Sequence, residues 1–276
     1  MKKVAIIGLG WLGMPLALAL QGRGYQVAGS KTTPDGVDAA RMCGVECYPL
    51  QVNPQLDADP EDLQALFQVD ALVITLPASR TVDGAENYCL AVQQVVDTAL
   101  AFSVPRIIFT SSVSVYGDTA GQVREGSPCR PVTPAGQSLL RLEEWLHQLP
   151  NTSVDILRLA GLVGPDRHPG RFLAGRTGLT GGAQGVNLVH LDDVTDAIML
   201  LLKLPRGGHR YNLCAPEHPA KRDFYPEKAR QMGLTPPAYL AEDQTAAGGK
   251  IVDGSRICHE LGFEYRYPDP ARMPFA

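Results

Sequence analysis

The sequence predicts an α/β protein built on a doubly wound parallel β-sheet. Three observations lead to this class: short β-branched runs alternate with helical segments, a glycine-rich turn directly follows the first run, and no internal repeat or low-complexity tract interrupts the alternation. Parallel strands need a crossover connection, usually a helix, so the alternation is typical of consecutive βαβ units. A chain of 276 residues, 45% of them hydrophobic, can bury a sizeable core.

The apolar patterning places a strand before almost every predicted helix. Pro15 falls in the first turn of the first helix, where its missing N–H would have no partner anyway. Asp59 is the expected N-cap of the third helix, and Asp192 or Asp193 that of the last. We expect strands at 4–7, 25–29, 46–50, 70–76, 106–110, 154–159 and 188–190. We expect helices at 12–21, 37–42, 60–67, 85–101, 134–149 and 194–204.

Two stretches depart from the alternation and define the expected domain organisation. Residues 165–185 are rich in glycine with little periodicity, and residues 215–276 are rich in proline with weak helical segments. We therefore expect a core at 1–164, to which 186–214 returns as part of the sheet. The remaining parts of 165–276 would form a small C-terminal substrate lobe that is interleaved with this core.

Charge and composition argue against several classes of partner. The net charge is −4 and the pI is about 5.9, so no broad positive field would attract nucleic acid or an anionic membrane. The apolar stretches are far shorter than the ~20 residues of a membrane span. The six cysteines are scattered without metal-ligand spacing. We expect a cytoplasmic protein with reduced thiols, no metal, no nucleic-acid partner and no membrane partner.

The first predicted strand runs into the turn Gly8-Leu-Gly10-Trp11-Leu12-Gly13. In a G-x-G-x-x-G turn between strand and helix, the first glycine permits the tight turn and the second lets a pyrophosphate approach the backbone. The third lets the helix pack on the strand, and the pyrophosphate rests at the helix N-terminus. The turn therefore predicts a Rossmann-type dinucleotide site; the alternative is a glycine turn that binds no ligand.

The end of the second strand indicates which dinucleotide is bound. NAD sites carry an acidic residue about 20 residues after the glycines, whereas this strand ends in Ser30, Lys31 and Thr32. A charge-assisted contact from Lys31 to a 2′-phosphate implies about 10- to 100-fold preference for NADP. The alternative is an exposed lysine in a site that accepts NAD. Leu76 and Pro77, at the end of the 70–76 strand, complete the expected cofactor contacts.

Further segments resemble the extended short-chain dehydrogenase/reductase family, the group of nucleotide-sugar epimerases and dehydratases. Residues 105–117 are similar to its serine-bearing S-S-x-x-V-Y-G strand, and residues 187–194 to its N-x-V-H-V-D-D-V segment. Residues 158–165, 211–213 and 256–262 fit as well, so the resemblance covers essentially the whole chain. It implies that Ser112 is the catalytic serine, which hydrogen-bonds the substrate oxygen. The alternative is a strand-end hydroxyl that caps local backbone.

The helix that should carry the family's Y-x-x-x-K pair departs from the pattern. Its frame is kept, but Ala135 stands in place of the tyrosine and Leu139 in place of the lysine. Arg141 lies on the wrong side of the helix to replace that lysine. Gly161 occupies a position where the family usually has asparagine. A positioned general acid contributes about 10²- to 10⁴-fold, so its loss weakens the standard mechanism without abolishing cofactor binding.

A replacement site is expected on the loop after the 154–159 strand. His168 is the preferred substitute proton donor, because an unperturbed imidazole titrates near neutrality. Arg171 and Arg176 on the same loop suit a carboxylate or phosphate of the substrate. Tyr116 is a further substrate-binding candidate. The alternatives are a solvated loop and, for Tyr116, a packed aromatic ring.

Two functions remain open from the sequence. One is an NADP(H)-dependent oxidoreductase or epimerase-like enzyme that acts on a small polar, anionic substrate. The other is a non-catalytic sensor whose NADP(H) occupancy alters a surface for a protein partner, which the missing tyrosine and lysine would also explain. In the resembled family the helices equivalent to 85–101 and 134–149 often pair across a two-fold axis, so a homodimer is also expected.

Overall fold

The computed structural model describes residues 2–52, 55–78, 82–241 and 248–275. Its main sheet has seven strands in the order β12-β9-β7-β6-β1-β2-β3. The register pairs β1 with β2 and β6, β2 with β3, and β6 with β7, all in parallel. The strands are β1 (Lys3–Ile7), β2 (Gln26–Lys31), β3 (Glu46–Pro49), β6 (Ala71–Ile74), β7 (Arg106–Ser112), β9 (Ser153–Leu159) and β12 (Arg210–Leu213). The predicted doubly wound α/β class is confirmed.

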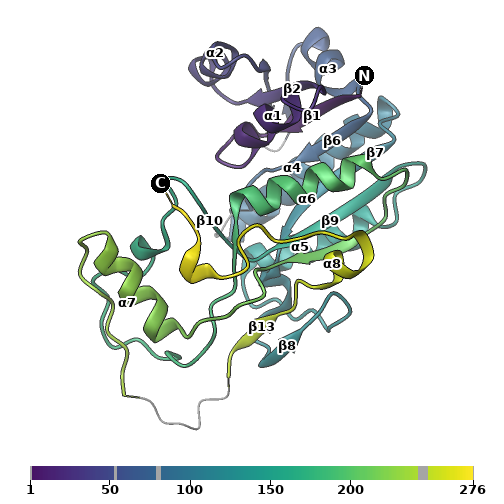
Figure 1. Ribbon diagram of the computed structural model, residues 1–276. Coiled ribbons are helices and arrows are strands. Elements are labelled where there is room, and N and C mark those ends of the chain that lie inside the picture. The colour runs from purple at the N-terminus through teal and green to yellow at the C-terminus, as the bar shows by residue number, and fades with distance from the viewer. Residues whose placement is uncertain (1, 53–54, 79–81, 242–247, 276) are drawn as a thin grey trace. The chain divides into compact units, whose positions relative to one another are not determined.

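Helices cover the sheet, with α6 on the near side and α4 and α5 on the far side in Figure 1. The helices are α1 (Gly13–Gln21), α2 (Pro34–Met42), α3 (Pro60–Phe67), α4 (Val82–Ala101), α5 (Pro134–Leu146), α6 (Leu191–Lys203), α7 (Lys221–Gln231) and α8 (Arg256–Leu261). Short 3-10 turns are η1 (Val113–Tyr116), η2 (Pro169–Arg171) and η3 (Pro270–Arg272). Two-stranded pairs join β4 (Gln51–Val52) to β5 (Leu56–Asp57), β8 (Gly121–Val123) to β13 (Lys250–Val252) and β10 (Gly161–Val163) to β11 (Leu188–His190).

Most predicted elements lie within a few residues of their observed bounds. The predicted strand at 188–190 exists as β11, but it pairs with β10 outside the main sheet. Asp59 occupies the N-cap position of α3 without a side-chain hydrogen bond. The capping role of Asp192 and Asp193 is wrong, since both lie inside the first turn of α6. Asp193 is buried and accepts hydrogen bonds from the backbone of Arg266 and Tyr267.

The chain divides into two compact units, each discontinuous in sequence. Unit 1 comprises Met1–Val115, Pro131–Leu157 and Thr195–Arg210, and unit 2 comprises Tyr116–Arg130, Arg158–Val194 and Tyr211–Ala276. Unit 2 thus includes stretches before residue 165 that the sequence places in the core. The assignment of a substrate lobe stays a prediction, because it concerns function.

The cores of the units differ in composition. In unit 1 the central strands β1 and β6 are almost completely buried, as expected for parallel strands covered on both faces. Unit 2 has its own cluster of buried apolar side chains, to which the aromatic residues Tyr225, Tyr267 and Phe275 add. That cluster consists of Val163, Val186, Leu188, Ala215, Phe224 and Met273.

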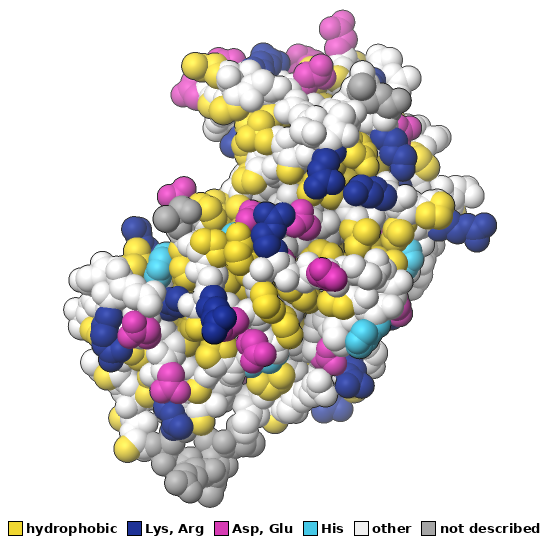
Figure 2. All heavy atoms as spheres, in the orientation of Figure 1, with side chains coloured by type: hydrophobic (Ala, Val, Ile, Leu, Met, Phe, Trp, Pro, Cys, Tyr) yellow, Lys and Arg dark blue, Asp and Glu magenta, His cyan; other side chains and the backbone are white. Residues whose placement is uncertain are grey.

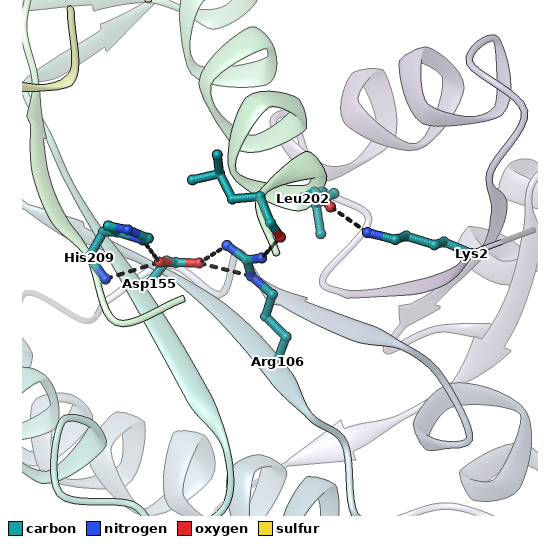
Figure 3. Close-up of polar contacts among 6 residues, drawn as sticks. Lys2, Arg106, Asp155, Leu202 and His209 are labelled. Atoms are coloured by element: carbon teal, nitrogen blue, oxygen red, sulfur yellow. Dashed lines mark hydrogen bonds and ion pairs between the residues drawn. The ribbon is translucent and has the colours of Figure 1, made fainter. Parts of the chain in front are cut away.

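Polar contacts in unit 1 surround the buried pair of Arg106, at the start of β7, and Asp155 in β9 (Figure 3). The guanidinium of Arg106 donates to the Asp155 carboxylate at 2.6 Å and to the carbonyl of Leu204 at 2.6 Å. The backbone N–H of His209 and its ring Nδ1 both contact the other oxygen of Asp155. The Nζ of Lys2 donates to the carbonyl of Leu202 at 3.0 Å. Two cations therefore bind carbonyls at the C-terminal end of α6, where the helix dipole favours positive charge.

The surface carries charges of both signs. On the face in Figure 2, acidic and basic side chains alternate with hydrophobic ones rather than forming a field of one sign. No helix in the described part of the chain is long and apolar enough to cross a bilayer.

Candidate functional site

The glycine turn has the geometry that a dinucleotide requires. Gly8 has φ of +103°, a conformation that favours glycine, and a Cβ on Gly13 would lie 2.1 Å from the carbonyl oxygen of Gly8. These two positions therefore fix the tight turn and the close packing of α1. A Cβ on Gly10, by contrast, would meet no atom within 4 Å. The backbone at Gly10 is open to the approach of a ligand.

Two side chains brace the turn from the neighbouring strands. Thr75, directly after β6, donates its hydroxyl to the Gly8 carbonyl at 2.6 Å. Ser30 in β2 accepts a hydrogen bond from the N–H of Gly8 at 3.1 Å. The sequence suggested that the Ser30 hydroxyl contacts a phosphate of the cofactor. Ser30 is only 3% exposed, however, so it supports the turn and offers no exposed hydroxyl. The bracing role of Thr75 had no signal in the sequence, because it depends on the pairing of β1 with β6.

The turn opens into a pocket of about 250 Å³ at the carboxyl ends of β1, β2 and β6. Lys31 contributes a positive charge to the lining of this pocket, and none of the described lining residues carries a carboxylate. Of the predicted cofactor contacts, the pocket brings together Gly8, Gly10, Ser30, Lys31, Thr32 and Leu76, with Ile7, Leu9, Leu50 and Val52 as apolar walls. Trp11, Leu12, Gly13 and Pro77 are not part of this lining.

The start of α1 suits an anion. Leu12 occupies the N-cap position, where it makes no side-chain cap hydrogen bond. Most helices place Ser, Thr, Asp or Asn at this position to satisfy the first N–H groups. A helix N-terminus without a side-chain cap is able to bind an anion. The open backbone at Gly10, the uncapped helix and the pocket together fit a dinucleotide.

Ser112, the expected catalytic serine, ends β7 in unit 1. Its side chain is half-buried, and Oγ accepts a hydrogen bond from the N–H of Ser114 at 3.1 Å. This is the local backbone contact that the alternative interpretation predicted. Because Ser112 acts as the acceptor, its hydroxyl proton can still be donated to a substrate oxygen.

At the start of α5, the structure places Leu139 and Arg141 as follows. Leu139 is 4% exposed and belongs to the apolar core of unit 1. Arg141 is exposed, and its guanidinium forms an ion pair with Glu86 at 2.7 Å and donates a hydrogen bond to Cys89 Sγ at 3.2 Å. The cationic group is thus bound to α4 and does not take the place of the family's lysine.

Tyr116 is corrected from a substrate-binding candidate to a core residue. Its side chain is 0% exposed, and its hydroxyl donates to Asn212 Oδ1 at 2.7 Å while it accepts from Arg158 at 2.9 Å. Burial raises the pKa of the phenol, an effect that the nearby Arg158 opposes. A substrate cannot reach this hydroxyl in the structure.

His168 has a structural role in unit 2 that opposes the proposed proton donation. Its Nδ1 accepts a hydrogen bond from the N–H of Gly170 at 3.0 Å, and its ring packs edge-on against Phe275. Desolvation lowers the pKa of His168, as do the charges of Lys228 and Arg171. Both effects favour the neutral ring, which is a poor acid. Arg171 and Arg176 are exposed, as expected for side chains that could meet an anion.

Comparison with known proteins identifies the family. Residues 4–214 match the model of the NAD dependent epimerase/dehydratase family. The chain therefore belongs to the NAD-dependent epimerase/dehydratase family.

A close relative and several solved structures extend the comparison. The chain is 63% identical to protein YeeZ of Escherichia coli strain K12 over 274 residues, 99% of each chain. It superimposes on UDP-glucose-4-epimerase from Stenotrophomonas maltophila, solved with NAD and formylated UDP-arabinopyranose, with a TM-score of 0.78, 18% identity and coverage of 99% and 96%. A short-chain dehydrogenase/reductase superfamily protein from Agrobacterium tumefaciens with bound NAD gives 0.75 at 21% identity, with coverage of 96% and 93%. These structures share the fold.

Proposed function

We propose that the protein is an NADP(H)-dependent oxidoreductase or epimerase-like enzyme acting on a small polar, anionic substrate. The observation that carries the cofactor assignment is the lining of the nucleotide pocket, in which Lys31 contributes a positive charge and no described residue contributes a carboxylate. A carboxylate there would repel a 2′-phosphate, whereas an ammonium binds it by a charge-assisted hydrogen bond.

The chain's own residues divide the work of binding. The backbone of the Gly8–Gly13 turn and the start of α1 hold the pyrophosphate, and Lys31 with Thr32 holds the 2′-phosphate. When bound, the nicotinamide group supplies or accepts a hydride. Ser112 orients the substrate oxygen by donating its hydroxyl. Arg171 and Arg176 supply cationic groups for the anionic part of the substrate.

A second function is favoured by the state of the catalytic positions. Leu139 is buried, Tyr116 is enclosed and the Nδ1 of His168 is bound to its own loop. A nucleotide-occupancy sensor that binds a protein partner needs the glycine turn and none of these groups. The homodimer, the cytoplasmic location and the absence of a nucleic-acid partner remain predictions of the sequence.

The cofactor assignment is tested by titrating the cofactor-stripped protein with NADPH and NADH and following nicotinamide fluorescence. We expect NADPH to bind at least about tenfold more tightly. Lys31→Ala should remove this preference and leave NADH binding unchanged. Lys3→Ala, an exposed lysine on the same sheet outside the pocket lining, is the matched control. Equal affinity of the wild-type protein for both nucleotides would overturn the preference.

The choice between enzyme and sensor is tested by hydride transfer. Loss of NADPH absorbance with a panel of small oxo-acids, reduced in Ser112→Ala at unchanged NADPH affinity, would establish the enzyme. Tight NADPH binding without turnover on any acid, together with nucleotide-dependent capture of a partner, would establish the sensor.

A further inference from the structure

Unit 2 contains a pocket of about 750 Å³ that is lined entirely by its own residues. β8 and β13 pair in parallel, with Gly121 opposite Lys250 and Val123 opposite Val252. Both strands therefore end at the same side of the pair, and the segments that follow form the two walls. These segments are 124–128 after β8 and 253–260, which includes most of α8.

Glu125 gives this pocket a buried negative charge. The residue is 7% exposed, and its Oε1 accepts a hydrogen bond from the backbone N–H of Asn212 at 2.8 Å. The other lining carboxylates, Asp253 and Glu260, are each paired with an arginine. Among the described residues the Glu125 carboxylate accepts a hydrogen bond from a backbone amide and makes no direct ion pair, although its charge is near enough to contribute to the raised pKa of Arg256. A buried carboxylate is costly unless a cation or several donors satisfy it.

A rigid network holds Glu125 in place. Arg158, 1% exposed, donates to the hydroxyl of Tyr116 at 2.9 Å and to the carbonyl of Glu125 at 3.3 Å. Tyr116 in turn donates to Asn212, the residue whose N–H binds the Glu125 carboxylate. A satisfied network of this kind restricts side-chain motion. The carboxylate is therefore fixed before any ligand arrives.

The walls of the pocket carry two arginine side chains, each of which forms an ion pair with a carboxylate. Arg256 pairs with Glu260 at 2.7 Å, and about half of each side chain is exposed (48% and 43%). Arg124 pairs with Asp253 at 2.9 Å and is 67% exposed. The Arg256–Glu260 pair is exposed on both sides and contributes little to stability, so the Arg256 guanidinium can exchange Glu260 for an incoming anion. Asp253, by contrast, is only 14% exposed, so its pair with Arg124 is partly buried.

We propose that this pocket binds a small molecule that carries a primary ammonium group, which Glu125 holds at the floor by a charge-assisted hydrogen bond. An α-amino acid would add its carboxylate to Arg256. A diamine would instead direct its second ammonium to Glu260 or Asp253. The site lies in unit 2 and does not depend on the nucleotide pocket.

The test measures binding of putrescine, glycine and acetate to the full-length protein by isothermal titration calorimetry. We expect an ammonium probe to bind and acetate not to bind. Glu125→Gln keeps an oxygen for the Asn212 N–H but removes the charge, and should weaken ammonium binding about 10- to 100-fold. Glu144→Gln, an exposed carboxylate on α5 outside the pocket, should leave binding unchanged.

Further variants separate the ligand classes and guard against misfolding. Arg256→Gln should weaken glycine and spare putrescine if the ligand is an amino acid; tight binding of putrescine alone would assign a diamine. If Glu125→Gln does not fold, Glu125→Asp is the second variant. Its side chain is shorter by one methylene, so the carboxylate lies farther from the ligand and ammonium binding should still weaken. Failure of both ammonium probes to bind, or equal binding by the wild-type protein and a folded Glu125 variant, would overturn the proposal.

Discussion

The glycine turn and the start of α5, both in unit 1, differ in how much of the family's sequence pattern they contain. The turn keeps every feature that a dinucleotide needs, including the tight contact at Gly13 and the open backbone at Gly10. The start of α5 keeps its helical frame, with the side chain of Thr133 as the N-cap. The lysine position, however, is occupied by Leu139, whose side chain is buried in the apolar core. The two regions show that cofactor binding and proton transfer rest on different features of this fold. The first depends on backbone shape and the second on single side chains.

We expect the largest effect on stability at Leu139, the buried residue that occupies the position of the family's catalytic lysine. Leu139→Ala should lower the free energy of unfolding by about 2–5 kcal/mol, because it leaves a cavity in a packed interior. NADPH affinity should not change. Gln137→Ala, exposed on the same helix, should stay within about 0.5 kcal/mol of the wild type. Urea denaturation and nicotinamide fluorescence measure the two quantities; a loss of NADPH affinity without a loss of stability would contradict the assignment to core.

A smaller effect on stability should separate two glycines of the turn. Gly13→Ala brings a methyl group against the Gly8 carbonyl, and we expect a loss of about 1–3 kcal/mol together with weaker NADPH binding. Gly10→Ala meets no protein atom, so its stability should remain within about 0.5 kcal/mol of the wild type while NADPH binding falls. Urea denaturation measures the stability of each variant, and nicotinamide fluorescence measures its NADPH affinity. Unchanged NADPH affinity in Gly10→Ala would show that the ligand does not approach the backbone there.

The smallest effect concerns acid stability of unit 2. The folded state lowers the pKa of His168, chiefly by desolvation and then through Lys228 and Arg171. The unfolded chain therefore binds a proton first as the pH falls through about 6.5, and stability present above that pH is lost below it. The pKa of His190 is lowered as well, so part of the effect persists in His168→Gln. Denaturation midpoints between about pH 7.5 and 5.5 should fall less steeply in that variant; an equal or steeper fall would contradict the assignment.

The sequence predicts the nucleotide edge well because its constraints are local. Gly8, Gly10 and Gly13 are close in sequence, and each is explained by a local requirement: a positive φ at Gly8, an open backbone at Gly10 and close packing at Gly13. Side chains whose role depends on distant segments were not predictable. Thr75 reaches the turn through strand pairing, and Tyr116 is enclosed by Asn212 and Arg158, which are far away in the chain.

Unit 2 shows the same limit on a larger scale. β8 and β13 are three residues each, too short for an alternating pattern, and their pairing joins segments more than a hundred residues apart. The pocket above them therefore had no signal in the sequence. Its carboxylate, Glu125, lies in a stretch of irregular composition that gave no reason to expect burial.

The network at Arg106 bears on the order in which the protein can be completed during synthesis. Arg106 and Asp155 are both present once β9 has been made, but His209 follows Asp155 by 54 residues, and the Leu204 carbonyl also belongs to this later stretch. Between them the ribosome must produce residues 158–194, all of which belong to unit 2. An emerging chain therefore carries a half-satisfied buried arginine until the last part of unit 1 appears. The nucleotide-binding half cannot finish folding first, although it begins at the N-terminus.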